Sequence, residues 1–141
     1  MTIKYKIIAK YIKDLIFKIP DPKTFFLLSK NISNYKIQID IKSNQFRDKI
    51  IEVETCLSLK PIQNNFKEIT TKIIHSTIVE LDKNIKDKES LEEIILIKVP
   101  SEIYQEIRSS FIFLFEKSGF KDIKIDEKVD FKLLHKQRKI Q

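Results

Sequence analysis

The chain has 141 residues, of which 42% are hydrophobic and 33% charged, and its formal net charge is +7. This length suits a single domain over residues 1–141, and the apolar content excludes a disordered chain. No apolar run approaches the ~18 residues of a membrane span, and the lone cysteine cannot form an internal disulfide, so we expect a cytoplasmic protein without membrane contact.

Alternating patterns predict strands in the first part of the chain. The segment 11–22, YIKDLIFKIPDP, predicts a strand that two prolines end. Isoleucines alternate with polar residues over 35–42, which is typical of a half-buried strand. The same alternation over 51–60 puts five residues on one face: Ile51, Val53, Thr55, Leu57 and Leu59.

A further strand is predicted over 68–81, with apolar residues on parts of both faces. Its register stays open. The polar segments 42–45 and 60–65 predict turns between the strands. Connections this short favour antiparallel neighbours, since a parallel crossover needs a dozen or more residues.

Helical signals follow the strands. Ser90 and Glu93 form a capping box, and Pro100 predicts the first turn of a second helix. That helix should end at the only glycine, Gly119, and the segment 130–141 predicts a final amphipathic helix. Together the elements predict an α+β fold: a four-stranded antiparallel sheet with helices packed on one face.

The helix that begins at Pro100 carries more apolar residues than one stripe needs. Phe113 lies well off the stripe, so a second apolar surface is required, and a partner subunit is the economical source. The alternative is one overfilled core with an exposed phenylalanine. The stripe consists of Ile103, Ile107, Phe111 and Leu114, widened by Tyr104, Ile112 and Phe115. The candidate oligomer contacts are Ile107, Phe111, Phe113, Leu114 and Phe115.

No motif in the chain carries chemistry. His75, His135 and Cys56 lack neighbours at metal-ligand or nucleophile spacing, and a single glycine cannot build a phosphate-binding loop. Glu52 and Glu54 point the same way from one strand, which a solvated strand face explains as well as acid–base chemistry does. We therefore expect no enzyme, no metal site and no cofactor, and the aromatic residues and aliphatic strands favour a binding protein.

The segment 11–26, YIKDLIFKIPDPKTFF, resembles the start of the bacterial protein-export chaperone family SecB. The resemblance continues through 37–59 and resumes over 99–134, so it covers most of the chain. The matching positions are Tyr11, Asp14, Phe17, Pro20 and Phe26 in the first segment, Glu52 and Val53 in the second, and Arg108, Asp130 and Phe131 in the third.

The resemblance implies an ATP-independent cytosolic holdase that binds unfolded precursor proteins and delivers them to the SecA translocation motor. It also implies a homotetramer, a dimer of dimers, although the residues alone leave tetramer or dimer open. Client grooves in the family are apolar and lined by aromatics, and acidic residues on the outer sheet contact SecA. Asp14 is therefore the candidate SecA contact, and the candidate client groove consists of Phe17, Phe25, Phe26, Val53 and Leu57.

The charge of the chain departs from the family's pattern, because SecB proteins are usually acidic. Lys18 stands at the family's second acidic position in the first strand, and the final segment, HKQRKIQ, is basic. Two alternatives stay open: a SecB-like chaperone of an antitoxin, and a small basic nucleic-acid-binding protein. Lysines gathered in one contiguous stripe would favour nucleic acid, and scattered lysines favour the chaperone.

Overall fold

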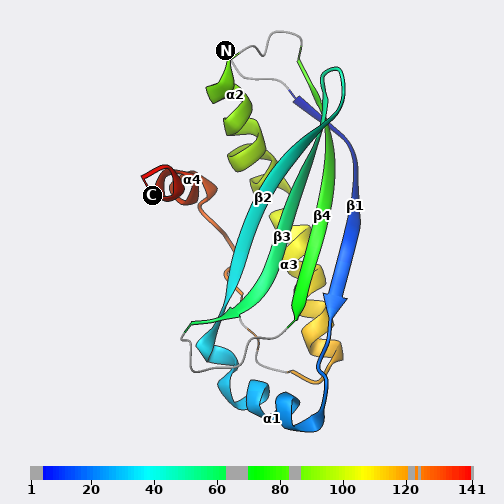
Figure 1. Ribbon diagram of the computed structural model, residues 1–141, viewed down its shortest axis with the longest axis vertical. Helices are drawn as coiled ribbons and strands as arrows, with labels where there is room; N and C mark the ends of the chain where they lie inside the picture. Colours follow the sequence, from blue (N-terminus) through cyan, green and yellow to red (C-terminus); the bar gives the residue numbers. More distant parts are fainter. Residues whose placement is uncertain (1–4, 63–69, 83–86, 121–122, 124, 141) are drawn as a thin grey trace.

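The computed structural model describes residues 5–62, 70–82, 87–120, 123 and 125–140 (Figure 1). The four strands form one antiparallel sheet in the order β1-β4-β3-β2, which confirms the predicted α+β fold. The strands are β1 (Tyr5–Phe17), β2 (Tyr35–Arg47), β3 (Ile50–Pro61) and β4 (Thr71–Leu81). The helices are α1 (Pro22–Asn31), α2 (Lys88–Glu93), α3 (Val99–Lys117) and α4 (Phe131–Ile140), with short segments η1 (Ile32–Asn34) and η2 (Ile94–Lys98).

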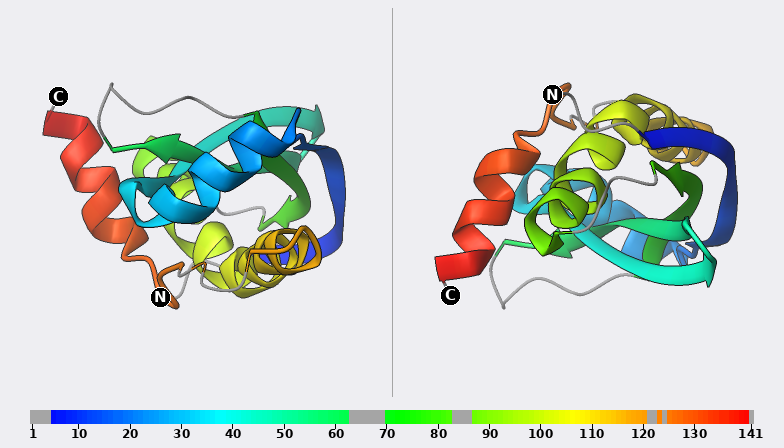
Figure 2. Two further views of the ribbon diagram at one scale, coloured as in Figure 1. Left: turned by 90° about the horizontal axis from the view of Figure 1, so that it is seen from below. Right: turned by 90° about the horizontal axis from the view of Figure 1, so that it is seen from above.

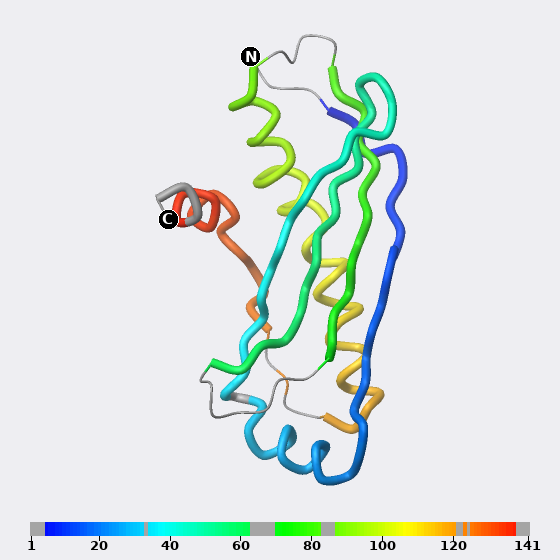
Figure 3. Tube along the Cα trace, in the orientation of Figure 1, coloured from blue at the N-terminus to red at the C-terminus, as the bar shows by residue number. Residues whose placement is uncertain are grey.

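The helices occupy three different places around the sheet (Figures 1 and 2). The run from α2 to α3 lies along one face, and α1 closes the end of the molecule at which β1 finishes. The trace in Figure 3 shows that α4 stands apart from the sheet at the end of an extended arm. The sheet therefore has an inner face, which α3 covers, and an outer face, which no helix covers in these views.

The β2–β3 hairpin corrects the predicted turn at 42–45. Those residues continue β2, and Lys42 and Asn44 pair with Glu54 and Glu52 on β3. The actual turn is the two residues between Arg47 and Ile50, and Lys49 adopts a left-handed φ of 63° there. The polar run was misread as a turn because its side chains form polar pairs on the outer face.

Strand β1 is longer than predicted and less regular. It begins at Tyr5, six residues before the expected start, and register shifts beside Ile8 and Lys13 interrupt its pairing with β4. The pairing settles the register of β4, since Asp14 lies opposite Ile74. β4 itself begins at Thr71, and residues 68 and 69 lie outside the described residues.

The two predicted helices around Pro100 are one continuous run. Asp87, rather than Ser90, caps α2, because its carboxylate accepts the Ser90 N–H at 3.3 Å. Backbone dihedrals stay helical through Lys98, and the π-helical segment η2 precedes Pro100. Proline cannot donate to the carbonyl four residues back, and the wider π turn accommodates that lost hydrogen bond without ending the helix.

The end of α3 confirms the predicted glycine cap. Gly119 has a φ of +97°, its N–H donates to the Glu116 carbonyl, and the Phe120 N–H donates to the Phe115 carbonyl. This pair of bonds is a Schellman motif, which turns the chain sharply at the helix end. The final helix is also confirmed, as α4 begins at Phe131, after Asp130, whose carboxylate accepts the Leu133 N–H at 3.0 Å.

The core between the sheet and α3 is divided into two apolar clusters. One surrounds Phe111 and Phe115, and the other surrounds Val53 and Val79. The predicted inner face of β3 is confirmed, because Ile51, Val53, Thr55, Leu57 and Leu59 are all buried. Thr55, His75 and Thr77 are buried on the same inner face, and the Thr55 Oγ1, His75 Nδ1 and Thr77 Oγ1 atoms have no hydrogen-bond partner among the described residues.

Candidate functional site

A series of aromatic contacts runs from the surface into the core at the α1 end. Phe26 packs edge-on against Phe25 with ring centroids 5.4 Å apart, and Phe25 lies 4.9 Å from Phe120. Phe120 continues to Phe115 at 5.5 Å, which Phe17 meets edge-on at 4.9 Å. Such tilted and edge-on pairs are the favoured arrangements of aromatic rings. Three predicted site residues, Phe17, Phe25 and Phe26, therefore belong to one connected cluster.

Gly119 makes this cluster possible. A Cβ added at this position would lie 3.2 Å from a carbon of the Phe25 ring, closer than side chains normally approach. The absence of a side chain thus allows two things at once: the positive φ of the helix cap and the close seating of Phe25 over the end of α3. The pattern at Gly119 indicates a cap, but only the structure reveals the second role.

The five predicted groove residues differ in how much of each side chain is exposed to solvent. The Phe26 side chain is 62% exposed, whereas Phe17 and Phe25 are half-buried. Val53 and Leu57 are 0% exposed, because they lie on the inner face of β3 beneath the helices. In the single chain Val53 and Leu57 therefore expose no surface, and only Leu57 belongs to the same apolar cluster as Phe115 and Phe120. Client contact by any of the five stays a prediction.

Sequence reasoning missed a pocket of about 410 Å³ beside strand β2. The pocket lies between the edge strand β2 and the arm that leads to α4. Tyr35 and Tyr104 contribute rings to it, and Leu134 contributes an aliphatic side chain from α4. The remaining lining residues are Lys36, Ile37, Ile39, Ile125, Asp126 and Val129. The isolated apolar residues in the polar segment 121–130 were the signal that could have revealed it.

Three side chains of α3 hold the arm in place by binding its carbonyl oxygens. The Tyr104 hydroxyl donates to the Asp126 carbonyl at 2.6 Å, and Arg108 Nε donates to the Ile125 carbonyl at 3.2 Å. Gln105, the residue after Tyr104 on α3, donates to the Glu127 carbonyl of the arm. Burial raises the pKa of Tyr104, so this hydroxyl keeps its proton and remains a donor. These bonds fix the wall of the pocket opposite β2.

The outer face of the sheet carries a polar network around Glu52 and Glu54. Lys13 lies 3.1 Å from Glu52 and 3.4 Å from Glu54, and Lys42 lies 3.6 Å from Glu54. The Ser76 hydroxyl donates to Glu52 at 2.7 Å and holds the pKa of that carboxyl below its usual range. This pair of carboxylates is thus neutralised by lysines, which fits a structural face better than acid–base chemistry.

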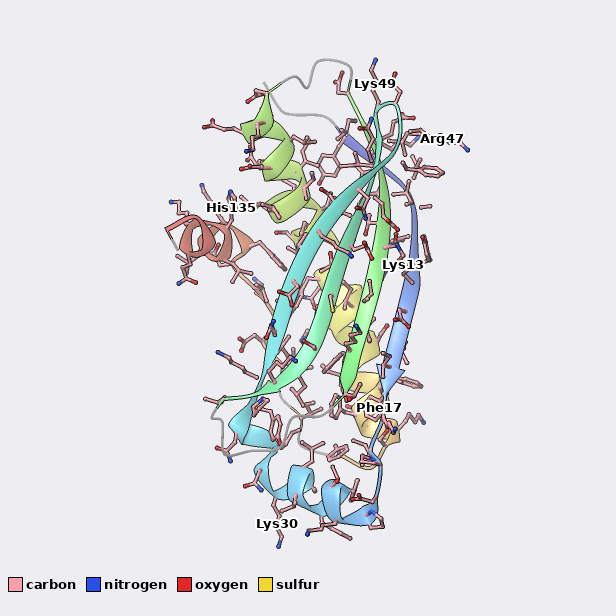
Figure 4. The ribbon with its side chains drawn as sticks, viewed as in Figure 1. Lys13, Phe17, Lys30, Arg47, Lys49 and His135 are labelled. Atoms are coloured by element: carbon pink, nitrogen blue, oxygen red, sulfur yellow. The ribbon has the colours of Figure 1, made fainter. Side chains whose placement is uncertain are left out.

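Asp14, the predicted SecA contact, is exposed on strand β1. Its carboxylate accepts the N–H of Leu15 at 2.9 Å. It lies opposite Ile74, which lies opposite Cys56, so the register places it on the outer face. Lys13 precedes it, and Figure 4 shows this lysine on β1. The structure leaves its contact with SecA a prediction.

The predicted oligomer contacts on α3 fall into two groups. Ile107, Phe111 and Phe115 are almost entirely buried within the single chain, so their surface is used by its own core. Phe113 is 56% exposed, with the Lys117 ammonium 5.6 Å from its ring centre, and Leu114 is half-buried. The second apolar side of this helix is therefore smaller than the sequence suggests.

Strand β1 has the exposed apolar surface that was expected on α3. Ile8, Ile12 and Leu15 are between 41% and 48% exposed, as is Tyr11. β1 is an edge strand, and edge strands with exposed apolar residues are ready to pair with a further chain. Sequence reasoning missed this surface because the alternation in β1 predicts a half-buried strand, not an uncovered one.

The two histidines and the cysteine occupy positions that give no sign of chemical reactivity. Burial lowers the pKa of His75 and raises the pKa of the Cys56 thiol, so neither is activated. His135 Nε2 lies 3.8 Å from Glu92. Among the residues that the structure describes, no group of three or more His, Cys, Asp or Glu side chains is placed to hold a metal ion. No helix within those residues is long and apolar enough to cross a membrane.

The chain is similar to SecB proteins in both sequence and structure. The chain is 39% identical over 138 residues to the putative protein-export protein SecB of Pelagibacter ubique (strain HTCC1062), covering 98% of this chain and 99% of that protein. It is 28% identical over 130 residues to the protein-export protein SecB of Orientia tsutsugamushi (strain Boryong), covering 91% and 79%. A solved SecB-like chaperone of Mycobacterium tuberculosis, in complex with a peptide from an antitoxin, shares the fold with a TM-score of 0.57 at 11% identity, covering 86% and 90%.

A family model covers nearly the whole chain. The model described as preprotein translocase subunit SecB matches residues 2–141. Its members are chaperones and not enzymes. The aromatic cluster at the α1 end, the pocket beside β2 and the exposed edge strand are thus features of a protein that belongs to the SecB family of protein-export chaperones.

Proposed function

We propose that this protein is an ATP-independent holdase of the bacterial cytoplasm that binds unfolded precursor proteins and delivers them to the SecA motor. The observation that carries the proposal is the exposed Phe26 ring at the α1 end, which is accompanied by a 410 Å³ pocket that Tyr35 lines. An unfolded client exposes apolar side chains, and burying them gains about 25 cal/mol per Å².

The pocket and the aromatic cluster suit an extended client. Tyr35 follows α1 and η1 directly, so the pocket begins where the helix of Phe25 and Phe26 ends. Rings accept apolar side chains without demanding a particular sequence, which supports broad client recognition. Ordering the client opposes binding, so affinity should rise with the length of the segment that engages both surfaces.

We further propose that the protein works as a homotetramer, a dimer of dimers. Strand β1 supports this, because Ile8, Ile12 and Leu15 leave an apolar edge that a second copy can cover. Phe113 supplies a second contact on the exposed side of α3. Phe113→Asp should weaken the assembly, because a carboxylate buried without a partner costs several kcal/mol.

Delivery to SecA would use the outer face of the sheet, where Asp14 is exposed. The neutralised pair Glu52 and Glu54 contributes little net negative charge there, so Asp14 should account for much of the attraction. We expect Asp14→Asn to weaken SecA binding a few-fold in calorimetry at low salt, with the client affinity unchanged. Equal SecA affinity of the variant and the wild type would remove Asp14 from the docking surface.

An aggregation assay tests the holdase function. A reduced, unfolded model client should stay in solution in the presence of the wild-type protein and without ATP. Phe26→Ser should reduce this protection, whereas Phe46→Ser, which alters an equally exposed ring at the hairpin end, should not. No protection by the wild-type protein at any ratio would refute the function, and equal loss in both variants would refute the placement of the site.

The two alternative functions predict protection of different proteins, so the same aggregation assay distinguishes them. A SecB-like chaperone of an antitoxin would protect an aggregation-prone antitoxin but not a general client. A nucleic-acid-binding protein would protect neither. The lysines of the sheet argue against nucleic acid, since Lys13 and Lys42 pair with Glu54, and Lys10 pairs with Glu106.

A further inference from the structure

Exposed apolar residues and exposed lysines occur together at the α1 end of the molecule. Phe26 and Leu27 on α1 are exposed, and so is Ile62, whose N–H donates to the Asn34 carbonyl just beyond α1. The exposed lysines around them come from three elements: Lys18 after β1, Lys23 and Lys30 on α1, and Lys117 at the end of α3. Figure 4 shows Lys30 pointing away from the body of the molecule at this end.

Contacts in the fold bring these elements together at one end. The Lys18 N–H donates to the Thr70 carbonyl beside Phe17, and Phe17 meets Phe115 two residues before Lys117. Phe25 lies over Gly119, so α1 is seated against the end of α3. Lys18, α1 and Lys117 therefore lie at the same end of the molecule, although they are far apart in the sequence, and within α1 itself Lys23 and Lys30 lie three or four residues from Phe26 and Leu27.

Few carboxylates oppose these lysines. The acidic residues described near this end are Asp21 and Glu116, and Asp21 caps α1 by accepting the Thr24 N–H at 2.7 Å. On the sheet the situation is reversed, because Lys13 lies within ion-pair distance of two carboxylates. The positive charge at the α1 end is thus arranged around the proposed client surface.

We propose that the α1 end selects client segments in which aromatic or aliphatic residues are flanked by aspartate or glutamate. This inference rests on the proposed holdase function and adds the chemical class of its clients. The apolar part of the segment covers Phe26 and Leu27, and its carboxylates lie near Lys23 and Lys30. Exposed apolar rings and lysines in one surface complement such a peptide better than a nucleic acid, whose backbone has charge without apolar side chains.

The test uses two labelled peptides with the same apolar centre, one flanked by aspartates and the other by lysines. Fluorescence anisotropy measures their binding to the full-length protein at low and at moderate salt. We expect the aspartate-flanked peptide to bind roughly ten-fold more tightly, with the preference decreasing as salt screens exposed charges beyond ~10 Å. Lys23→Gln with Lys30→Gln should reduce the preference roughly three-fold or more.

A control variant separates local charge from net charge. Lys6→Gln with Lys88→Gln removes the same charge from exposed lysines on β1 and α2, distant from α1, and should leave the preference unchanged. Equal affinity for both peptides, or an equal loss of preference in the control, would overturn the inference. So would a single-stranded oligonucleotide that binds more tightly than either peptide and competes with them.

The aggregation assay shows separately whether the proposed holdase function fails together with this inference. If neither peptide binds although the protein still prevents aggregation, the α1 end is not the selective surface, and the holdase function stands. If the aggregation assay also shows no protection, the proposed function fails, and the client class fails with it.

Discussion

The C-terminal half of α3 and the strand β1 are both rich in apolar residues, yet the fold treats them in opposite ways. Phe111 and Phe115 on α3 are fully buried, whereas Ile12 and Leu15 on β1 are exposed. The difference follows from position, because α3 lies over the middle of the sheet and β1 is its edge. Apolar content alone therefore does not say which surface remains for a partner.

The largest change in stability should come from truncating a side chain on the buried side of α3. Phe111→Ala should lower the free energy of unfolding by about 3–5 kcal/mol, because it removes a fully buried ring and leaves a cavity. Phe113→Ala, two residues away on the exposed side, should cost less than about 1 kcal/mol. Urea unfolding of both variants checks this, and equal costs would mean that the two sides of α3 are buried alike.

The exposed apolar residues of β1 should affect the association between copies of the chain. Ile12→Asp with Leu15→Asp should weaken self-association by on the order of 2–4 kcal/mol, because both residues form the bare edge of β1. Sedimentation velocity at micromolar concentration measures the change, and far-UV circular dichroism shows that the chain is still folded. If the variant sediments as the wild type does, β1 is not the contact between copies.

A smaller change in stability, which depends on pH, should come from His75 beneath α3. Burial lowers the pKa of His75 below its ordinary value of 6.5, with Lys10 adding to this and Glu106 opposing it. As pH falls through 6.5, the unfolded chain binds a proton at this histidine more readily than the native chain does. The free energy of unfolding should therefore fall as pH decreases below 6.5, by at most about 1.4 kcal/mol per pH unit.

Thermal unfolding of the wild type and of His75→Asn between pH 7.5 and 5.5 isolates this contribution. The two stability curves should converge toward acidic pH, because only the wild type loses stability through this group. Parallel curves would show that His75 is protonated equally in the native and unfolded chains.

The smallest expected effect lies in the hairpin. Lys49 has a left-handed φ of 63°, which costs a residue with a Cβ about 1–2 kcal/mol, while glycine adopts it freely. Lys49→Gly should raise the free energy of unfolding by about 0.5 kcal/mol after the added chain entropy is counted. A lower midpoint in urea would contradict the assigned turn.

The sheet and the helix ends were predictable because their signals are local. Alternation identified the inner face of β3, and a single glycine identified the end of α3. The turn at 42–45 was wrong because polar residues that pair across strands look the same in sequence as polar residues that turn. Pro100 does lie in the first turn of α3, as its sequence context predicts, but the π-helical segment η2, which joins α2 to α3 without a break, has no signal in the sequence.

The candidate site was predictable only in part. Phe25 and Phe26 follow from the family resemblance, but the pocket beside β2 depends on an arm held by its carbonyl oxygens. Side-chain patterns carry no information about backbone acceptors, so the sequence gives no sign of that wall. Likewise, the burial of Val53 and Leu57 follows from their place in the middle of the sheet, which depends on the strand order.

The most direct test of the account is site-specific crosslinking to an unfolded client. A photoreactive phenylalanine analogue is placed at Phe26 in one variant and at Phe113 in another, and each is illuminated with a reduced, labelled client. We expect client adducts at position 26, and adducts between copies of the chain at position 113. Client adducts at 113 that equal or exceed those at 26 would contradict the division of the apolar surface between clients and copies.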